Sequence, residues 1–404
     1  MATREELLNQ FRELHAKRDY LGALGACRSI LDLNPRDALG WRNMGACYLA
    51  LGQEDDAREM MRRGLDIDPK DSYAHYYLGL LASRKNDHQG AIDHYQKALD
   101  CNENLTEAAL GLASSYYQVG DLPNALFYYT QAYQNNQDNP DVARSFGVIL
   151  MRVGQLSQAA YYLREAIERR PDWAEPHVEL GEVLRLMGED RDAVAELLKG
   201  LRIRMKPEGL VSLGRIHLKY NEPRKALAHL HQALKLGPNF APAHHALGLC
   251  HMALAEWSEA IKHCEEAYKW DPDDLETVLD LAAALVEGGG PGSLDRGYRL
   301  ASAVRVKDPN QVRAFDILGW CLFKQGRVPE AFENLEKART LIELRESRQK
   351  ADAPIYEHLA VVYDGMHDSM MSREMYSRAL EADPSRREEW QKKSRRIGGN
   401  DSPA

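Results

Sequence analysis

The sequence predicts an all-α protein, built as a solenoid of about eleven stacked helix pairs followed by a carboxyl-terminal capping helix. Three observations predict this fold class. Apolar residues recur at three- and four-residue steps, which is the spacing of one helix face. The whole pattern then returns along the chain every 34 residues. Small residues also stand at matching positions of nearly every repeat, which lets the two helices of a pair approach closely.

The stretch from Trp41 to Pro69 shows the repeat most clearly. Its apolar spacing predicts one helix over about residues 39–51 and a second over about 57–65, joined by a glycine-centred turn. Gly45 and Ala57 leave room for the two backbones, while larger side chains fill the surrounding volume. The proline at the end stops the second helix.

Eleven such repeats can be placed in register, beginning near residues 4, 38, 72, 106, 140, 174, 207, 241, 275, 312 and 353. Glycine or alanine occupies the eighth position of every repeat after the first, and alanine, glycine or serine occupies the key position of every second helix. One pair cannot bury its apolar face alone, so neighbouring pairs must stack. We therefore expect one continuous, elongated domain over residues 1–386.

This register resembles the tetratricopeptide repeat family, whose repeats are helix-turn-helix units of the same length. The resemblance covers residues 4–386 and implies a right-handed superhelical α-solenoid in which the first helices line a concave groove. The family is defined by its architecture and binds many unrelated partners, so the fold alone does not choose a function.

Several departures from the repeat carry their own expectations. Thr3 and Glu6 have the spacing of a capping box, so the first helix should begin almost at the terminus. The sixth repeat is one residue short near residues 202–206, and the ninth is lengthened by a glycine-rich segment, 287–292, expected to form a flexible loop. The second helix of the tenth repeat is expected to continue through Lys350 and project beyond its neighbours.

The last residues predict a cap. Residues 387–397 are expected to form a capping helix, because Trp390 and Ile397 take core positions of an unfinished twelfth repeat while lysines and arginines give its outer face charge. A nuclear-import or nucleic-acid signal is the alternative for this basic segment. Residues 398–404 are expected to be disordered.

The composition of the chain argues against several classes of function. A net charge of −9 and a pI near 5.9 argue against a surface built to bind nucleic acid. No apolar run is long enough to span a membrane and no signal sequence is recognisable at the start, so we expect a soluble protein. The six cysteines form no Cys-x-x-Cys pair, which is consistent with a reducing, cytoplasmic location.

Histidines concentrate in repeats seven and eight, where the spacing of His244 and His251 could suggest a metal site. His244 takes the repeat position of Trp41, and His251 takes that of Tyr48, so packing roles are the preferred interpretation. No nucleophile, base and orienting residue can be grouped in the sequence. We therefore predict no catalytic centre, no metal and no cofactor.

The resemblance assigns groove exposure mainly to the second, fifth, ninth, twelfth and thirteenth positions of each repeat. In repeats one to seven the charged residues at the last four of these positions are Arg12, Arg42, Arg84, Arg144, Arg152, Arg185, Arg215 and Lys219, with one acid, Glu182. In repeats eight to eleven acids predominate. Apolar groove positions include Tyr76, Tyr117, Met151, Trp320 and Phe323.

An apolar surface with spaced arginines suits an extended or helical peptide that carries both acidic and hydrophobic residues. The leading hypothesis is therefore a non-enzymatic scaffold that binds peptide segments or partner helices in the groove and so assembles or recruits a larger complex. The alternative is a self-assembling structural subunit whose groove accepts another copy and forms homo-oligomers. Nucleic acid is not an expected partner, because stacking aromatics are few and half of the groove is acidic.

Overall fold

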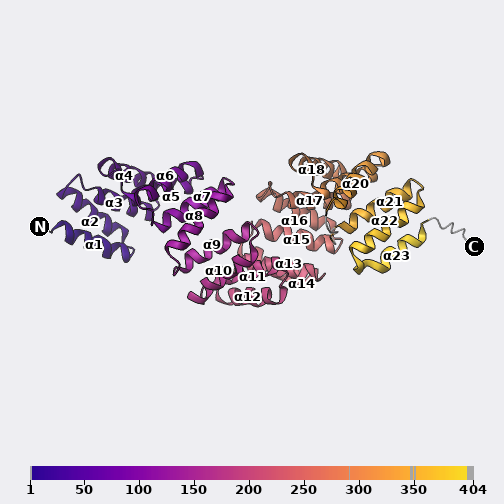
Figure 1. Cartoon of the computed structure of the whole chain (residues 1–404), viewed down its shortest axis with the longest axis horizontal. Coiled ribbons are helices and arrows are strands. Elements are labelled where there is room, and N and C mark those ends of the chain that lie inside the picture. The colour runs from indigo at the N-terminus through magenta and orange to yellow at the C-terminus, as the bar shows by residue number, and fades with distance from the viewer. Residues whose placement is uncertain (1, 291, 346–348, 350–351, 398–404) are drawn as a thin grey trace, which may run out of the picture. The chain divides into compact units, whose positions relative to one another are not determined.

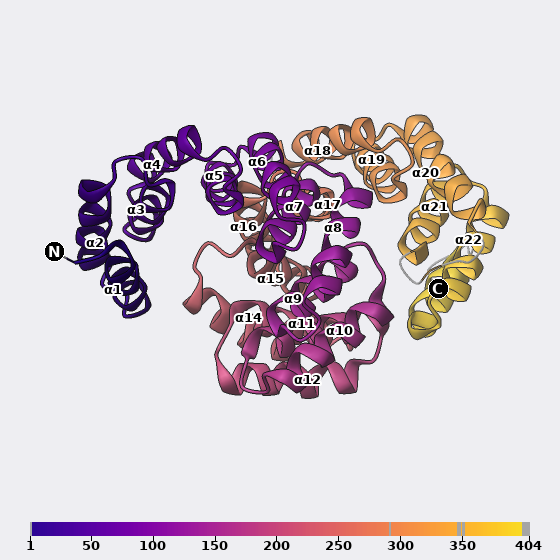
Figure 2. The same cartoon turned by 60° about the vertical axis from the view of Figure 1, so that its left-hand side comes forward.

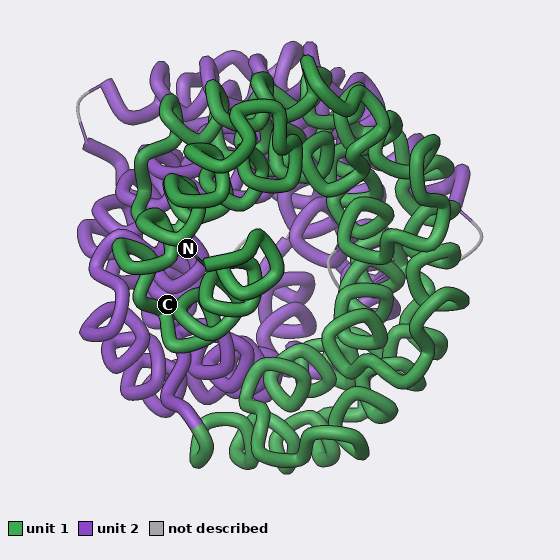
Figure 3. Tube along the Cα trace, turned by 90° about the vertical axis from the view of Figure 1, so that its left-hand side faces the viewer, with its two compact units in different colours: residues 1–203 green, residues 204–404 purple. Residues whose placement is uncertain are grey.

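The computed structural model describes residues 2–290, 292–345, 349 and 352–397, and every regular element within these residues is a helix (Figure 1). The all-α prediction is confirmed. The predicted tail, residues 398–404, lies outside the described residues. The chain divides into two compact units, residues 1–203 (unit 1) and 204–404 (unit 2), coloured green and purple in Figure 3. This division falls at the short linker of the sixth repeat, and a solenoid continuous across it stays a prediction.

Unit 1 consists of six helix pairs. They are α1 (Arg4–Ala16) with α2 (Tyr20–Leu33), α3 (Ala38–Ala50) with α4 (Glu54–Ile67), α5 (Ser72–Arg84) with α6 (His88–Cys101), α7 (Thr106–Gln118) with α8 (Leu122–Asn135), α9 (Pro140–Arg152) with α10 (Leu156–Arg169), and α11 (Ala174–Met187) with α12 (Asp190–Ile203).

Unit 2 consists of five further pairs and a final helix. They are α13 (Pro207–Lys219) with α14 (Pro223–Leu236), α15 (Ala241–Ala253) with α16 (Trp257–Trp270), α17 (Leu275–Gly288) with α18 (Ser293–Lys307), α19 (Val312–Lys324) with α20 (Val328–Glu343), α21 (Ala353–Gly365) with α22 (Ser369–Ala382), and, after a 3-10 turn η2 (Pro384–Arg386), α23 (Arg387–Arg396). Every first helix begins at the residue where the sequence register begins its repeat.

Helices stack in the same order within each unit. A first helix packs against its own second helix, and that second helix packs against the next first helix, as α20, α21 and α22 do in Figure 2. First helices of successive pairs also contact one another: α3, α5 and α7, and likewise α9 and α11, in unit 1, and α13, α15, α17, α19 and α21 in unit 2. We call the surface that these helices form the first-helix face, and the surface of the second helices the second-helix face.

The first and last elements are fixed by specific side chains. The capping box of α1 is confirmed, since Thr3 N–H donates to Glu6 Oε2 at 2.7 Å and Glu6 N–H donates to Thr3 Oγ1 at 3.3 Å. At the other end Trp390 of α23 is only 1% exposed and joins the core formed by α21 and α22. None of the described helices combines the length and the apolar run that a bilayer crossing requires.

One expectation about helix length is wrong. The second helix of the tenth repeat, α20, ends at Glu343 and does not continue through Lys350, although part of 344–350 lies outside the described residues. Described residues beyond α20 bond a buried carboxylate at the start of the next pair. Asp352 Oδ1 accepts from Arg345 at 3.2 Å and Asp352 Oδ2 accepts from the Gln349 N–H at 2.7 Å.

The two helices of a pair approach most closely at the eighth position. A Cβ atom built on Gly319 would lie 2.6 Å from Leu335 Cγ and 3.0 Å from the carbonyl oxygen of Ala331 on α20. Gly181 meets α12 in the same way, 2.6 Å from Leu197 Cγ. These glycines are present because the partner helix occupies the space that a side chain would need.

Gly319→Ala should lower the free energy of unfolding by about 1–3 kcal/mol, because overpacking exceeds the gain of about 1 kcal/mol in helix propensity. Gly25 in α2 is the matched control, since an added Cβ there meets nothing within 4 Å. Gly25→Ala should therefore raise stability. Urea denaturation followed by circular dichroism measures both, and equal effects of the two substitutions would contradict the packing argument.

The turn inside every pair places at least one residue in the left-handed region. Glycine stands there in six pairs, including Gly52 at φ 78°, but the other five turns hold Arg18, Asn86, Asn221, Ala255 and His367 at φ 55–64°. The left-handed conformation costs an L-residue about 1–2 kcal/mol, and asparagine tolerates it better than most. The strain is therefore clearest at Ala255.

Ala255→Gly should raise the free energy of unfolding by about 0.5–1 kcal/mol, because relief of the left-handed strain exceeds the extra entropy of glycine in the unfolded chain. Ala255→Val should lower it, since a β-branched side chain is least compatible with positive φ. Thermal denaturation of the three proteins gives the order directly. A valine variant as stable as the glycine variant would show that this turn is not strained.

Candidate functional site

A cavity of about 640 Å³ opens on the first-helix face of unit 2. Its walls come from α15, α16, α17, α19, α21 and η2, so it depends on the stacking of four successive repeats. We call it the Trp320 pocket. The lining residues include Met252, Trp257, Val286, Glu287, Arg313, Asp316, Ile317, Trp320, Ile355, His358 and Arg386.

Trp320 is held in place on several sides and is still partly exposed to the pocket. Its indole N–H donates to Glu287 Oε1 at 2.6 Å. The ring stacks on His358 with centroids 4.2 Å apart and on Phe323 with centroids 5.4 Å apart. Lys324 Nζ lies 2.9 Å from Glu287 Oε2 and 5.5 Å from the indole centroid. The predicted groove residues Trp320 and Phe323 are thus brought together as one aromatic surface.

The charged groups of the Trp320 pocket are paired within the chain. His358 Nδ1 lies 2.7 Å from Asp316 Oδ1, and Arg386 lies 3.1 Å from Glu357 Oε2. Arg313 bonds both Glu276 and Asp280. Since acids and bases balance, the pocket offers an incoming group aromatic and aliphatic surface more than net charge.

Burial and ion pairing act in opposite directions on one group in each of two carboxylate–histidine pairs of unit 2, His358 with Asp316 and Asp280 with His245. Burial alone would lower the pKa of His358, but the Asp316 carboxylate outweighs burial and leaves that pKa above its ordinary value. Burial alone would raise the pKa of Asp280, but bonds from His245 and Arg313 leave that pKa below its ordinary value. For His358 and for Asp280 the charge of the partner thus outweighs the effect of burial.

A recurring charge pair joins the first helices of successive repeats. It connects the fifth position of one repeat to the sixth position of the next: Arg144 Nε to Glu179 Oε2 at 2.8 Å, His245 Nε2 to Asp280 Oδ2 at 2.7 Å, and Asp316 to His358. The first two pairs are 35 residues apart and the third is 42 apart, because the tenth repeat is longer. The opposite charges of these pairs are visible in the sequence, but the sixth position was not among the groove positions that the sequence analysis considered.

The predicted groove arginines of unit 1 lie on or at the ends of the first helices, and several are engaged by acids of the same chain. Arg42 lies 3.1 Å from Asp71 Oδ1, and Arg84 lies 3.6 Å from Glu54 Oε1. Arg185 lies 2.7 Å from Glu182 Oε1. Counting acids only at groove positions missed Asp71, which is the N-cap of α5, and Glu54, which belongs to a second helix.

The remaining predicted residues differ in exposure. Arg12 is exposed and donates to Asn9 Oδ1 at 3.0 Å, and Arg152 is exposed at the end of α9. The predicted apolar groove residues of unit 1 are half-buried; they are Tyr76, Tyr117 and Met151. The other two predicted basic residues, Arg215 and Lys219, belong to α13 of unit 2.

The histidines of repeat eight pack against one another. His244 Nδ1 lies 3.1 Å from His263 Nδ1, and His251 stacks on His263 with centroids 5.5 Å apart. Burial, with the neighbouring histidines, lowers the pKa of His263 to about 4. His251 Nδ1 is taken by Glu256 at 2.7 Å. Among the described residues, no group of three or more histidines, cysteines and carboxylates has a geometry that could hold a metal ion.

Asp316→Asn should destabilise the protein more at pH 6 than at pH 9. A histidine whose pKa is raised by folding contributes stability that is complete below its unfolded pKa of about 6.5 and is lost as pH rises through the folded pKa. The melting temperature at both pH values measures the effect. His358→Gln is the control, because it should remove this pH dependence, and an equal loss at both values would show that the pair is not charged.

Comparison with known proteins places these features in a family. A family model described as Tetratricopeptide repeat matches residues 5–172, and a second model of the same description matches residues 217–285. No curated protein sequence matches the chain.

Solved structures resemble the chain in fold. The APC/C hetero-tetramer Cut9–Hcn1 has a chain 12% identical, with a TM-score of 0.52, covering 95% of this chain and 88% of its own. YrrB, a TPR protein with an unusual peptide-binding site, is 21% identical, with a TM-score of 0.41, covering 48% of this chain and 98% of its own. MamA is 24% identical, with a TM-score of 0.35, covering 40% and 94% respectively. At these identities the likeness concerns the fold.

Proposed function

The chain belongs to the tetratricopeptide repeat family, and from this premise we propose that it is a non-enzymatic scaffold. It binds peptide segments or helices of partner proteins on its first-helix faces and thereby assembles a larger complex. The family's general use as a protein-interaction fold supports the class of function. The choice of surface comes from the residues of this chain.

The Trp320 pocket is the observation that carries the proposal. Its volume of about 640 Å³ accommodates one or two apolar side chains of a bound segment. Aromatic side chains in partly closed pockets dominate the binding energy of many protein interfaces. Since Trp320 is already fixed by Glu287 and His358, little side-chain freedom is lost when a partner binds.

The first-helix face of unit 1 adds a preference for acidic, amphipathic segments. Exposed Arg12 and Arg152 supply charge, and half-buried Tyr76, Tyr117 and Met151 supply apolar surface. Guanidinium groups bind carboxylates with two parallel hydrogen bonds. Arg144 acts differently, because its bonds to Glu179 make it part of the helix stacking as well as of the surface.

Trp320→Ala should reduce recovery of bound partners at least tenfold when the tagged, full-length chain is used for affinity capture from a lysate of its source cells, with quantification by mass spectrometry. Loss of a buried aromatic anchor costs about 2 kcal/mol or more in such interfaces. Trp270→Ala is the matched control, because Trp270 is 47% exposed on α16 and does not line the pocket.

Circular dichroism of both variants checks that they remain folded, and Trp320→Phe keeps an aromatic ring if the alanine variant does not. Equal recovery by the original chain and a folded Trp320 variant would contradict the pocket's role. If the captured protein is another copy of this chain, and light scattering shows that particle size increases with protein concentration, the function is that of a self-assembling subunit and not of a scaffold.

A further inference from the structure

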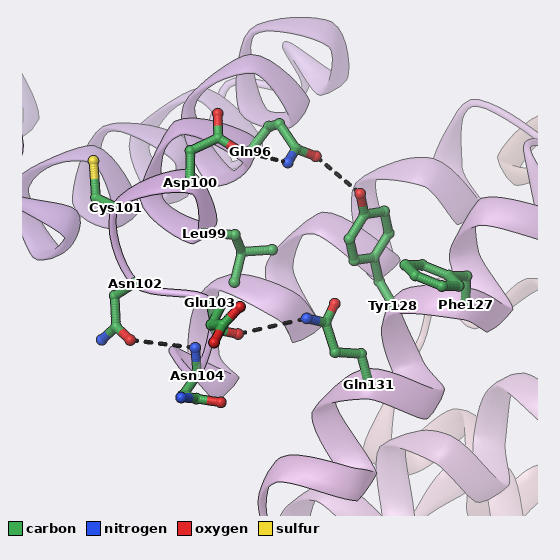
Figure 4. A pocket seen from close by; sticks show the side chains of 10 residues that line it. All are labelled: Gln96, Leu99, Asp100, Cys101, Asn102, Glu103, Asn104, Phe127, Tyr128 and Gln131. Carbon is green, nitrogen blue, oxygen red and sulfur yellow. Dashed lines mark hydrogen bonds between the residues drawn. The ribbon is translucent and has the colours of Figure 1, made fainter.

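A second hollow lies on the second-helix face of unit 1, far along the surface from the groove positions of its repeats. It has a volume of about 670 Å³ and opens between the end of α6, the loop that follows it, and α8. Figure 4 shows Phe127 and Tyr128 side by side on one wall, Gln131 below them, and Asp100 and Glu103 on the opposite side. Nothing in the proposed scaffold function uses this surface.

The sequence around this pocket is depleted of positive charge. The chain has 52 lysines and arginines and 14 histidines, yet none occurs in the 46 residues from 98 to 143. The same stretch contains six acids, and helix α8 carries no charged residue at all. Asp138 and Asp141 pair with Arg169 and Arg170 of α10. Within the described residues no cation pairs with the other four acids, so the part of the region around the pocket presents negative charge.

Aromatic side chains stand exposed beside that charge. Phe127 is 62% exposed and Tyr161, one repeat further along, is 61% exposed. Both occupy the twenty-second position of their repeats, which in the two preceding repeats holds the acids Glu59 and Asp93. Phe127 meets Tyr128 edge to face at 5.0 Å. Exposed rings at a position that holds an acid in the two preceding repeats indicate an interaction surface.

The carboxylates of the pocket are hydrogen-bond acceptors, while the amides of Asn102 and Asn104 also carry donors. Asp100 accepts only from Gln96, at 3.0 Å, and within the described part of the chain no cation pairs with Asp100 or Glu103. Gln131 uses its amide N–H on the Glu103 carbonyl at 3.5 Å, and its buried Oε1 accepts from no described residue. A fitting ligand must therefore donate hydrogen bonds and carry positive charge.

We propose that this pocket binds an arginine side chain within a basic segment of a partner protein. A guanidinium carries five N–H donors and no acceptor, which matches the two exposed carboxylates. Its planar face stacks on aromatic rings, which Phe127 and Tyr128 supply at the rim. Tyr161 of α10 is a second exposed ring one repeat further along, on which residues flanking the arginine would pack.

The test is a display library of random 12-residue peptides, selected on the full-length chain. Each recovered peptide is then compared on the original chain and on a triple variant, Asp100→Asn with Glu103→Gln and Phe127→Ala. Peptides lost on the triple variant should be enriched in arginine relative to the library. Made synthetically with a fluorescent label, they should bind the triple variant at least tenfold more weakly, and changing the arginine to citrulline should have a similar effect.

Asp66→Asn is the matched control. Asp66 is an exposed acid at the same repeat position as Asp100, but its neighbour at the twenty-second position is Asp93 instead of an aromatic residue. The control should leave affinity unchanged. All altered side chains are exposed or lie at the pocket, and a melting curve for each variant confirms folding.

Three outcomes would overturn the proposal: no peptide distinguishes the original chain from the triple variant, the distinguished peptides lack arginine enrichment, or Asp66→Asn weakens them equally. Concentration-dependent self-association that the triple variant abolishes would also overturn it, by making a second copy of the chain the occupant. Peptides that bind the first-helix faces are unaffected by these substitutions, so a failure here is separate from a failure of the scaffold function.

Discussion

The close approach of two helices at one small side chain is the constraint on which the structure depends. Where Gly319 faces Leu335 and the Ala331 carbonyl, the space is already filled, and the same contact recurs at Gly181 against α12. This approach sets the angle within each pair and therefore which side chains reach the next pair. Because each repeat contacts only its neighbours, a local packing rule is sufficient to build the first-helix face of each unit.

Within that uniform framework the repeats differ in charge. The pair that joins the fifth and sixth positions is Arg–Glu between repeats five and six, His–Asp between eight and nine, and Asp–His between ten and eleven. In the last pair the acid stands at the fifth position and the base at the sixth, which reverses the order of the charges, while the two positions that are joined stay the same. Ion pairs of this kind make these three junctions specific, and they also neutralise charges that would otherwise be available to a partner.

The sequence was sufficient to predict the helix pairs and their starting residues, because the small residues and the apolar spacing are local signals that repeat eleven times. The binding surface was less accessible to prediction. Arg42 and Arg84 looked available only because their partners, Asp71 and Glu54, lie at a helix cap and on a second helix. The end of α20 was also missed, and Arg345, just beyond it, bonds the buried Asp352 of the next pair instead of a residue of its own helix.

Because residues 98–143 contain no lysine or arginine, this part of the chain lacks the sites at which trypsin and lysine-directed reagents act. Trypsin cleaves after lysine and arginine, so a digest releases the whole of α7 and α8 within one fragment, from Ala98 to Arg144. Acetylation and ubiquitylation of lysine have no target there, and neither do amine-directed cross-linkers. The acidic surface around Phe127 therefore keeps its charge under every lysine modification elsewhere in the chain, and exposed Cys101 offers a thiol for probes that lysine cannot supply.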